Sequence, residues 1–150
     1  MSDGGYGQSL LLDNTAWARL GQGRVSSSYE QRFIAAVEAD EIVVCAPFRL
    51  EALFSVHDSS TYTALQEELQ GMRQALADAD TLTCALHAQS ELAANPSVSH
   101  RVVPVSLLVA AVADQRSLGV LHYDEDFDVI VEHTSLNFAS VWVAPAGTVP

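Results

Sequence analysis

The sequence contains no lysine. All seven basic side chains are arginine, whereas aspartate and glutamate number 19, which leaves a formal net charge of −12 at pH 7. Such a surface repels a phosphate backbone at long range, and this argues against a tight, non-specific binder of nucleic acid. It leaves open an enzyme that meets RNA through bound divalent cations, and it favours a basic protein partner. Acidity that serves only solubility is an equal alternative.

Cysteines and long apolar runs are also scarce. Cys45 and Cys84 lack a CxxC partner, so we expect two reduced, buried thiols rather than a disulfide or a zinc site. No apolar run is long enough to cross a bilayer, and the first nine residues lack the features of a signal peptide, which predicts a cytoplasmic protein with no membrane association. The length predicts one domain over 9–144, a flexible lead-in over 1–8 and an unstructured tail over 145–150.

Strand-like and helical segments alternate along the chain. "SLLLD" (9–13), "EIVVCAP" (41–47), "GVLHY" (119–123) and "SVWVA" (140–144) are typical of strands. Helical spacing marks 14–21, 29–40, 48–57, two helices over 61–94 that break near 77–81, the segment 106–117 that Gly119 stops, and a short helix after Asp126. This alternation predicts a three-layer α/β/α domain with a central parallel sheet.

Acidic residues follow the predicted strands. Asp13 and Asp124 each come directly after a strand, and Glu51 lies about one turn into the helix after another. The active crevice of such folds lies outside the carboxyl ends of the strands, so we expect these three acids to converge. Converging carboxylates repel one another unless a cation is present, and Mg²⁺ or Mn²⁺ prefers oxygen ligands. For Asp13 or Asp126 alone, a simple helix N-cap is the favoured interpretation.

Four segments resemble one known family in order and spacing: "LLLDNTAWARL", "CAPFRLEALFSV", "SLLVAAVADQRSLGVLHYDEDFDVI" and "VWVAPAG". They are similar to the PIN domain, specifically to the VapC-type toxin ribonucleases of bacterial toxin–antitoxin pairs. The resemblance covers Leu10 to Gly147, nearly the whole chain. It implies a fold in which four acids hold Mg²⁺ or Mn²⁺ for RNA cleavage, a basic antitoxin partner, and a homodimer.

The resemblance also assigns roles to individual residues. Asp13 matches the first family acid, and Thr15 matches the small polar residue that helps to organise the site. Glu51 matches the second acid, Asp124 the acid after the fourth strand, and Asp126 a frequent fifth member.

The third family acid is replaced by a serine. The family places that acid immediately before an "LLIAA"-like helix, where this chain has Ser106. Serine is a good N-cap, so we expect the helix to keep its support. The site loses a negative charge and a strong metal ligand, which should weaken metal binding. Asp114 lies roughly two turns further along the helix and is too distant to substitute.

Two functions therefore stay open. One is a Mg²⁺-dependent endoribonuclease with reduced activity, and the other is a degenerate PIN module that binds protein or RNA without cutting. A receiver domain or a haloacid-dehalogenase-like phosphatase also uses acids at strand ends, but both normally need a lysine. The helices between Glu30 and Ala94 are expected to supply the dimer contact. Trp17 and Trp142 are interpreted as core or subunit contacts, and His122 as a buried, hydrogen-bonded side chain.

Overall fold

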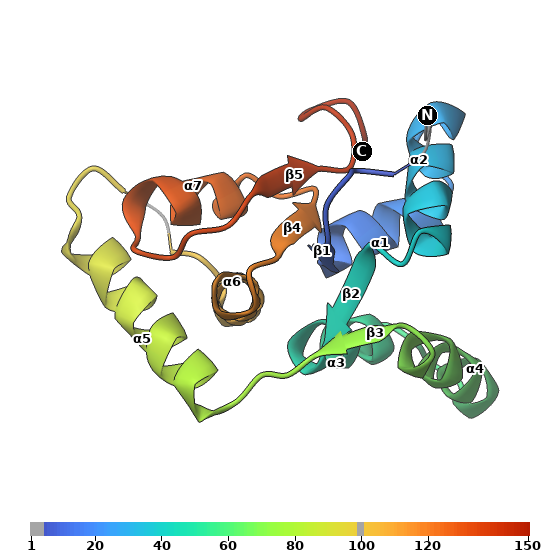
Figure 1. Ribbon diagram of the computed structural model, residues 1–150, viewed down its shortest axis with the longest axis horizontal. Helices are drawn as coiled ribbons and strands as arrows, with labels where there is room; N and C mark the ends of the chain where they lie inside the picture. Colours follow the sequence, from blue (N-terminus) through green and yellow to red (C-terminus); the bar gives the residue numbers. More distant parts are fainter. Residues whose placement is uncertain (1–4, 99–100) are drawn as a thin grey trace.

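A parallel sheet forms the centre of the molecule (Figure 1). The computed structural model describes residues 5–98 and 101–150, and within them lie five strands and seven helices. The strands are β1 (Leu10–Leu12), β2 (Ile42–Cys45), β3 (Arg73–Ala75), β4 (Gly119–His122) and β5 (Ser140–Trp142). The helices are α1 (Asn14–Gly21), α2 (Ser27–Glu38), α3 (Ala46–Phe54), α4 (Ser59–Gln70), α5 (Ala79–Ala94), α6 (Pro104–Arg116) and α7 (Asp126–His133).

All neighbouring strands run parallel, in the order β3-β2-β1-β4-β5. The central strand β1 consists of three leucines that are all fully buried, as expected for a parallel strand that is covered on both faces. The predicted three-layer α/β/α fold with a central parallel sheet is confirmed. Because the carboxyl ends of parallel strands meet at one edge, the residues that follow β1, β2 and β4 come together there.

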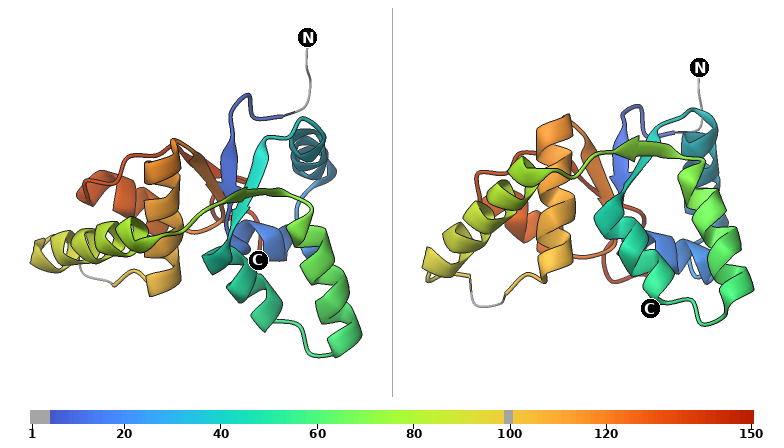
Figure 2. Two further views of the ribbon diagram at one scale, coloured as in Figure 1. Left: turned by 60° about the horizontal axis from the view of Figure 1, so that its bottom comes forward. Right: turned by 90° about the horizontal axis from the view of Figure 1, so that it is seen from below.

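Four of the helices form two pairs that flank this edge. Figure 2 shows α3 and α4 as a helical hairpin on one side of the molecule and α5 crossing α6 on the other, where the two helices pack together. Asp58 and Asp78 begin α4 and α5 by accepting hydrogen bonds from the N–H groups of Thr61 and Thr81, at 2.8 and 3.1 Å. None of the helices within the described residues combines the length and apolarity that crossing a bilayer requires.

The prediction of two helices over 61–94 missed a strand that lies between them. The helix α4 ends at Gln70 and α5 begins at Ala79, and between them β3 pairs with β2. The strand β3 has the sequence Arg-Gln-Ala and lies at the edge of the sheet. Because the side chains of β3 are exposed or only partly buried, no apolar run marked the strand in the sequence.

The start and end of α6 also differ from the prediction. The helix begins at Pro104 with Val103 as its N-cap, so Ser106 is the third helical residue and not the N-cap that we expected. Proline suits the first helical position because its fixed φ is helical and that position needs no N–H donor. The helix is ended by Ser117, which adopts a left-handed conformation (φ 57°), and not by Gly119.

Both ends of the described chain contact the domain. The N–H groups of Tyr6 and Gly7 donate to the Glu41 carboxylate at 2.7 and 3.0 Å. Val149 is buried, and its N–H donates to the Tyr123 hydroxyl at 2.8 Å. Tyr6, Gly7 and Val149 therefore contact the fold, whereas residues 1–4 of the expected lead-in lie outside the described residues. The domain boundaries themselves stay a prediction.

Gly119 occupies a position where no side chain fits. It opens β4 beside β1, and a Cβ atom built there would lie 2.6 Å from Leu10 Cδ2 and 3.0 Å from the Ala139 carbonyl oxygen. Leu10 is fully buried, so its side chain has no free space into which it could move. Glycine is therefore required for the close packing of β1 and β4, the two strands that end at the acids.

We expect Gly119→Ala to lower the free energy of unfolding by about 1–3 kcal/mol, the usual cost of forcing an extra methyl group into a packed core. Gly21→Ala is the matched control, because nothing lies within 4 Å of the Cβ position at that helix terminus. Urea denaturation of the two variants and the wild type measures the difference. Equal stability of Gly119→Ala and the wild type would contradict the packing argument.

Candidate functional site

Three acidic residues from separate segments lie at the carboxyl edge of the sheet. Asp13 directly follows β1, and Asp124 follows β4 with one residue between. The two strands are neighbours, and the Asp13 N–H donates to the Leu121 carbonyl at 3.0 Å. Glu51 lies in α3, which directly follows β2 on the other side of β1. This topology places the three acids at one edge of the sheet, and the charge of Asp124 raises the pKa values of both Asp13 and Glu51. Their convergence into one site stays a prediction.

Thr15 connects the ends of β1 and β4. Its hydroxyl donates to Asp13 Oδ2 at 2.5 Å, and the same Asp13 oxygen accepts the Thr15 N–H at 2.9 Å. The Thr15 hydroxyl in turn accepts the N–H of Tyr123, the residue before Asp124, at 2.9 Å. Asp13 is thus the N-cap of α1 and also lies among the acids at the strand ends. The N-cap role and the site role proposed for Asp13 are therefore compatible.

The acids repel one another in a poorly solvated environment. Burial raises the pKa of Asp13, the hydrogen bonds from Thr15 lower it in part, and the Asp124 charge raises it further. Partial burial also raises the pKa of Glu51, and the charges of Asp13 and Asp124 add to this effect. A site of this kind favours either protons or a bound cation, since both relieve the repulsion.

Asp124 and Asp126 are held in one turn. The Asp124 N–H donates to His122 Nδ1 at 3.1 Å, and Asp124 Oδ1 accepts the Asp126 N–H at 3.0 Å. Asp126 is the first residue of α7, and the N-cap of that helix is Glu125. The interpretation of Asp126 as a simple N-cap is therefore wrong. Its backbone position depends on the side chain of Asp124.

Ser106 lies in the first turn of α6, which packs against α3 and β1. The side chain is buried, with 5% of the residue exposed, and its N–H donates to the Val103 carbonyl at 3.1 Å. Its hydroxyl carries no charge, so the first turn of α6 adds no repulsion to the neighbouring acids.

The donor chemistry of the crevice fits a hard divalent cation, since Asp13, Glu51 and Asp124 all offer carboxylate oxygens. Within residues 5–98 and 101–150, however, no three acidic, histidine or cysteine side chains are grouped closely enough to form a ligand set for a metal ion. Glu51 is only half-buried, so a change of its rotamer is the movement that could complete such a set.

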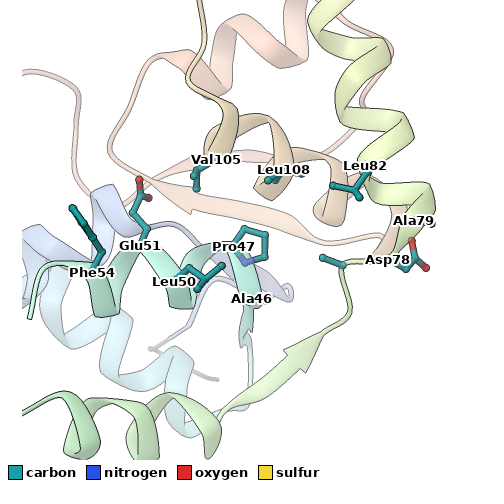
Figure 3. A pocket seen from close by; sticks show the side chains of 11 residues that line it. Ala46, Pro47, Leu50, Glu51, Phe54, Asp78, Ala79, Leu82, Val105 and Leu108 are labelled. Carbon is teal, nitrogen blue, oxygen red and sulfur yellow. The ribbon is translucent and has the colours of Figure 1, made fainter. Parts of the chain in front are cut away.

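An apolar groove opens beside Glu51. It has a volume of about 880 Å³ and is lined by residues of α3, α5 and α6 and of the segment before α5. Figure 3 shows Glu51 at one end of the groove, between Phe54 and Val105. Leu50 and Phe54 are 72% and 88% exposed, which is unusual for side chains of this size.

The sequence predicted the burial of His122 but not its hydrogen-bond partners. The prediction of a buried, hydrogen-bonded histidine is confirmed, because His122 is fully buried and its Nε2 lies 2.7 Å from Ser140 Oγ. Burial lowers the pKa of this imidazole to about 4, so it is neutral at physiological pH. The sequence did not predict Ser140 and Asp128 as partners of His122. The one feature that pointed to them was the polar Ser140 in the apolar strand pattern of 140–144.

The tryptophans and cysteines agree largely with the expectations. Trp17 and Trp142 pack against the core, Trp17 edge-on to Phe48. Both cysteines are free thiols; Cys45 is buried as expected, whereas Cys84 is only half-buried.

Comparisons with known proteins give consistent relatives. The chain is 34% identical over 140 residues to Ribonuclease VapC18 of Mycobacterium tuberculosis, which covers 93% of this chain and 98% of the relative. It is 32% identical over 139 residues to Ribonuclease VapC51 of the same organism, covering 93% and 96%. The fold is similar to a chain in the DNA-bound VapBC structure from Salmonella typhimurium, with a TM-score of 0.69, 14% identity and coverage of 91% and 99%. No family model matches the chain.

The raised pKa of Asp13 predicts that Asp13→Asn stabilises the metal-free protein. A folded-state pKa above the ordinary 3.8 gives stability that is present below pH 3.8 and is lost as the pH rises through the folded-state value. Asparagine keeps the N-cap and removes the charge, so we expect a gain of about 0.5–2 kcal/mol at pH 7 that disappears toward pH 3.8. Thermal unfolding in chelator across this pH range is the measurement.

Asp58→Asn provides a control with the opposite sign. Asp58 is also an N-cap, but the Thr61 N–H and the neighbouring hydroxyls lower its pKa. Its contribution is therefore present above pH 3.8 and is lost as the pH falls through the folded-state pKa, so this variant should be less stable than the wild type at pH 7. If both substitutions lowered the stability at pH 7, the charge of Asp13 would not destabilise the folded protein, and the prediction would be wrong.

Proposed function

This chain belongs to the VapC ribonucleases, and on that premise we propose that it is a toxin that hydrolyses RNA in the crevice of Asp13, Glu51 and Asp124. The observation that supports this site is that the pKa values of Asp13 and Glu51 are both raised, chiefly by burial and further by the charge of Asp124, with Asp13 also raising that of Glu51. Repelling carboxylates are costly to the fold, and a bound cation gives a reason for them. We place this activity in the cytoplasm.

Mg²⁺ or Mn²⁺ is the cofactor that suits these groups, and Asp13, Glu51, Asp124 and Asp126 are the residues that would hold it. Such an ion supplies Lewis acidity and charge neutralisation toward a phosphodiester. The protein's own part is to fix the acids: Thr15 orients the Asp13 carboxylate through two hydrogen bonds, and the Asp126 N–H orients that of Asp124. The half-buried Glu51 is the adjustable member of the set.

Ser106 sets the level of activity in this proposal. With a neutral hydroxyl in place of the third family acid, the crevice attracts a cation less strongly, and cleavage is slower than in a four-acid site. The same observation supports the second candidate function, a degenerate module that keeps the fold for binding. The two functions differ in whether the unaltered protein cuts RNA when Mg²⁺ or Mn²⁺ is supplied.

The partner that this surface favours is a basic antitoxin. The solved relative from Salmonella typhimurium is a VapBC complex, and the apolar groove beside Glu51 offers a place for a helical segment of such a partner. An arginine from that segment would reach the acids and replace the cation, forming charge-assisted hydrogen bonds. We also propose a homodimer, for which helices between Glu30 and Ala94 present exposed apolar side chains such as Ile34, Val37 and Leu86.

Ser106→Asp tests the proposed function. The new carboxylate should raise Mn²⁺ affinity and the rate of RNA cleavage by about 10–100-fold, the usual scale for changes around a metal site. Without metal, the variant should be less stable than the wild type, because a fourth acid, at a buried position, adds repulsion. Calorimetric titration with Mn²⁺ and cleavage assays with Mg²⁺, Mn²⁺ or chelator are the measurements.

Two control variants complete that experiment. Ser28→Asp adds the same charge to the first turn of α2 at an exposed position, and should change neither affinity nor rate. Asp13→Asn should abolish both. Strong cleavage by the wild type with no gain from Ser106→Asp would show that Ser106 lies outside the metal site. If neither form binds Mn²⁺ or cuts RNA, the binding module is the correct function.

A double-mutant cycle tests the arginine. The probe is a helical peptide with a leucine face and one arginine, compared with the same peptide carrying alanine. We expect Asp13→Asn with Glu51→Gln to couple to that arginine by about 1.5 kcal/mol or more and to reduce the salt dependence of binding. Glu67→Gln with Glu68→Gln, which removes two exposed charges of α4, is the control. No coupling would refute the role of the arginine.

A further inference from the structure

A chain of hydrogen bonds leads away from Asp124 through the fully buried His122 to Asp128, which is exposed. It begins at the Asp124 N–H, which donates to His122 Nδ1 at 3.1 Å. The other ring nitrogen, Nε2, lies 2.7 Å from Ser140 Oγ on β5. The Ser140 hydroxyl donates to Asp128 Oδ1 at 2.6 Å, and the Trp142 indole donates to Asp128 Oδ2 at 3.0 Å. Segments of β4, β5 and α7 are thus joined to the turn that carries Asp124.

The two ends of this chain fix the direction of every bond in it. At one end a main-chain N–H can only donate, so His122 Nδ1 must be the acceptor. At the other end the Asp128 carboxylate can only accept, so the Ser140 hydroxyl must donate to it. Ser140 Oγ is then left as the acceptor for His122 Nε2–H. The neutral ring therefore has a single tautomer, with its proton on Nε2 and its lone pair directed at Asp124.

The acidic cluster 124–128 is divided by this arrangement. Asp124 and Asp126 form the turn at the crevice, whereas Asp128 faces the hydrogen-bonded chain behind it. The ring of His122 is also fixed by contacts, with centroid distances of 4.8 Å to Phe127 and 5.0 Å to Trp142. An apolar side chain could fill that space. It could not accept the Asp124 N–H.

We infer that His122 is a positioning residue for the active site: Asp128 selects its tautomer through Ser140, and its Nδ1 then holds the main chain at Asp124, so that the Asp124 carboxylate faces Asp13 and Glu51. This inference rests on the proposed function, because it assigns the purpose of the turn to RNA cleavage. The hydrogen-bonded chain itself is a property of the folded protein and can be measured without activity.

Asp128→Asn is the decisive variant. The amide has the size of the carboxylate but can donate to Ser140, which turns the Ser140 hydroxyl toward His122 Nε2; the ring proton can then move to Nδ1 only by breaking the hydrogen bond from the Asp124 N–H. We expect the ¹⁵N shifts of the His122 ring to leave the Nε2–H pattern and kcat to fall about tenfold, with KM changing less. Glu132→Gln, an exposed position of the same helix, removes the same charge and should have neither effect.

Substitutions of His122 separate the two ring nitrogens. In His122→Asn the amide oxygen takes the place of Nδ1, so the Asp124 N–H should keep its acceptor and its protection from hydrogen exchange. In His122→Gln the amide reaches the place of Nε2 and Ser140, and the Asp124 N–H should lose that protection. We expect His122→Asn to retain at least about tenfold more activity than His122→Gln.

The outcomes separate this inference from the proposed function. A tautomer change in Asp128→Asn without loss of kcat overturns the positioning role while RNA cleavage stands. An unchanged tautomer, or equal exchange of the Asp124 amide in His122→Asn and His122→Gln, overturns the hydrogen-bonded chain. If the wild type cuts no RNA, the proposed function fails, and with it the positioning role in catalysis; the ring shifts and amide exchange then report on the turn alone.

Discussion

An almost fully buried carboxylate at the end of the central strand is the constraint on which this site depends. Asp13 is 2% exposed, and the strand before it is fully buried. A charge in this position is tolerated because Thr15 supplies two hydrogen bonds to one carboxylate oxygen. Thr15 is itself fixed by the main chain of Tyr123. The hydrogen bonds of Thr15 therefore offset the free-energy cost of burying the Asp13 carboxylate, and they also join the ends of β1 and β4.

The sheet and the acids at its edge could be predicted, because both follow from simple patterns. The leucines of β1 and the apolar runs of β2 and β4 mark buried parallel strands, and a parallel sheet brings the residues after them to one edge. The strand β3 could not be predicted, since its Arg-Gln-Ala sequence carries no apolar signal. Its pairing with β2 is a long-range effect that outweighs local propensity.

The residues of the site could be predicted from the sequence, but their positions at the helix ends and their hydrogen-bond partners were harder to predict. Ser106 was expected to be an N-cap, but Pro104 moves the start of α6 two residues earlier and places the serine inside the helix. Likewise, Asp126 looks like a cap in the sequence, whereas Glu125 takes that position and the Asp126 N–H is bound by Asp124. Both corrections concern one turn of backbone, and a residue pattern does not fix a helix end to that accuracy. The partners of His122 lie 6 and 18 positions away in the sequence, so no local pattern joins them.

The two edges of the sheet restrict how this molecule can associate with other chains. The strands β3 and β5 are each three residues long, so each outer edge exposes few unpaired main-chain groups. Side chains reinforce this: Arg73 of β3 is bonded to the Asp40 carbonyl, and Ser140 and Trp142 of β5 are bonded to Asp128. Short, occupied edges disfavour the addition of a foreign strand. Assembly through the helices is therefore favoured over the edge-to-edge growth that leads to aggregation.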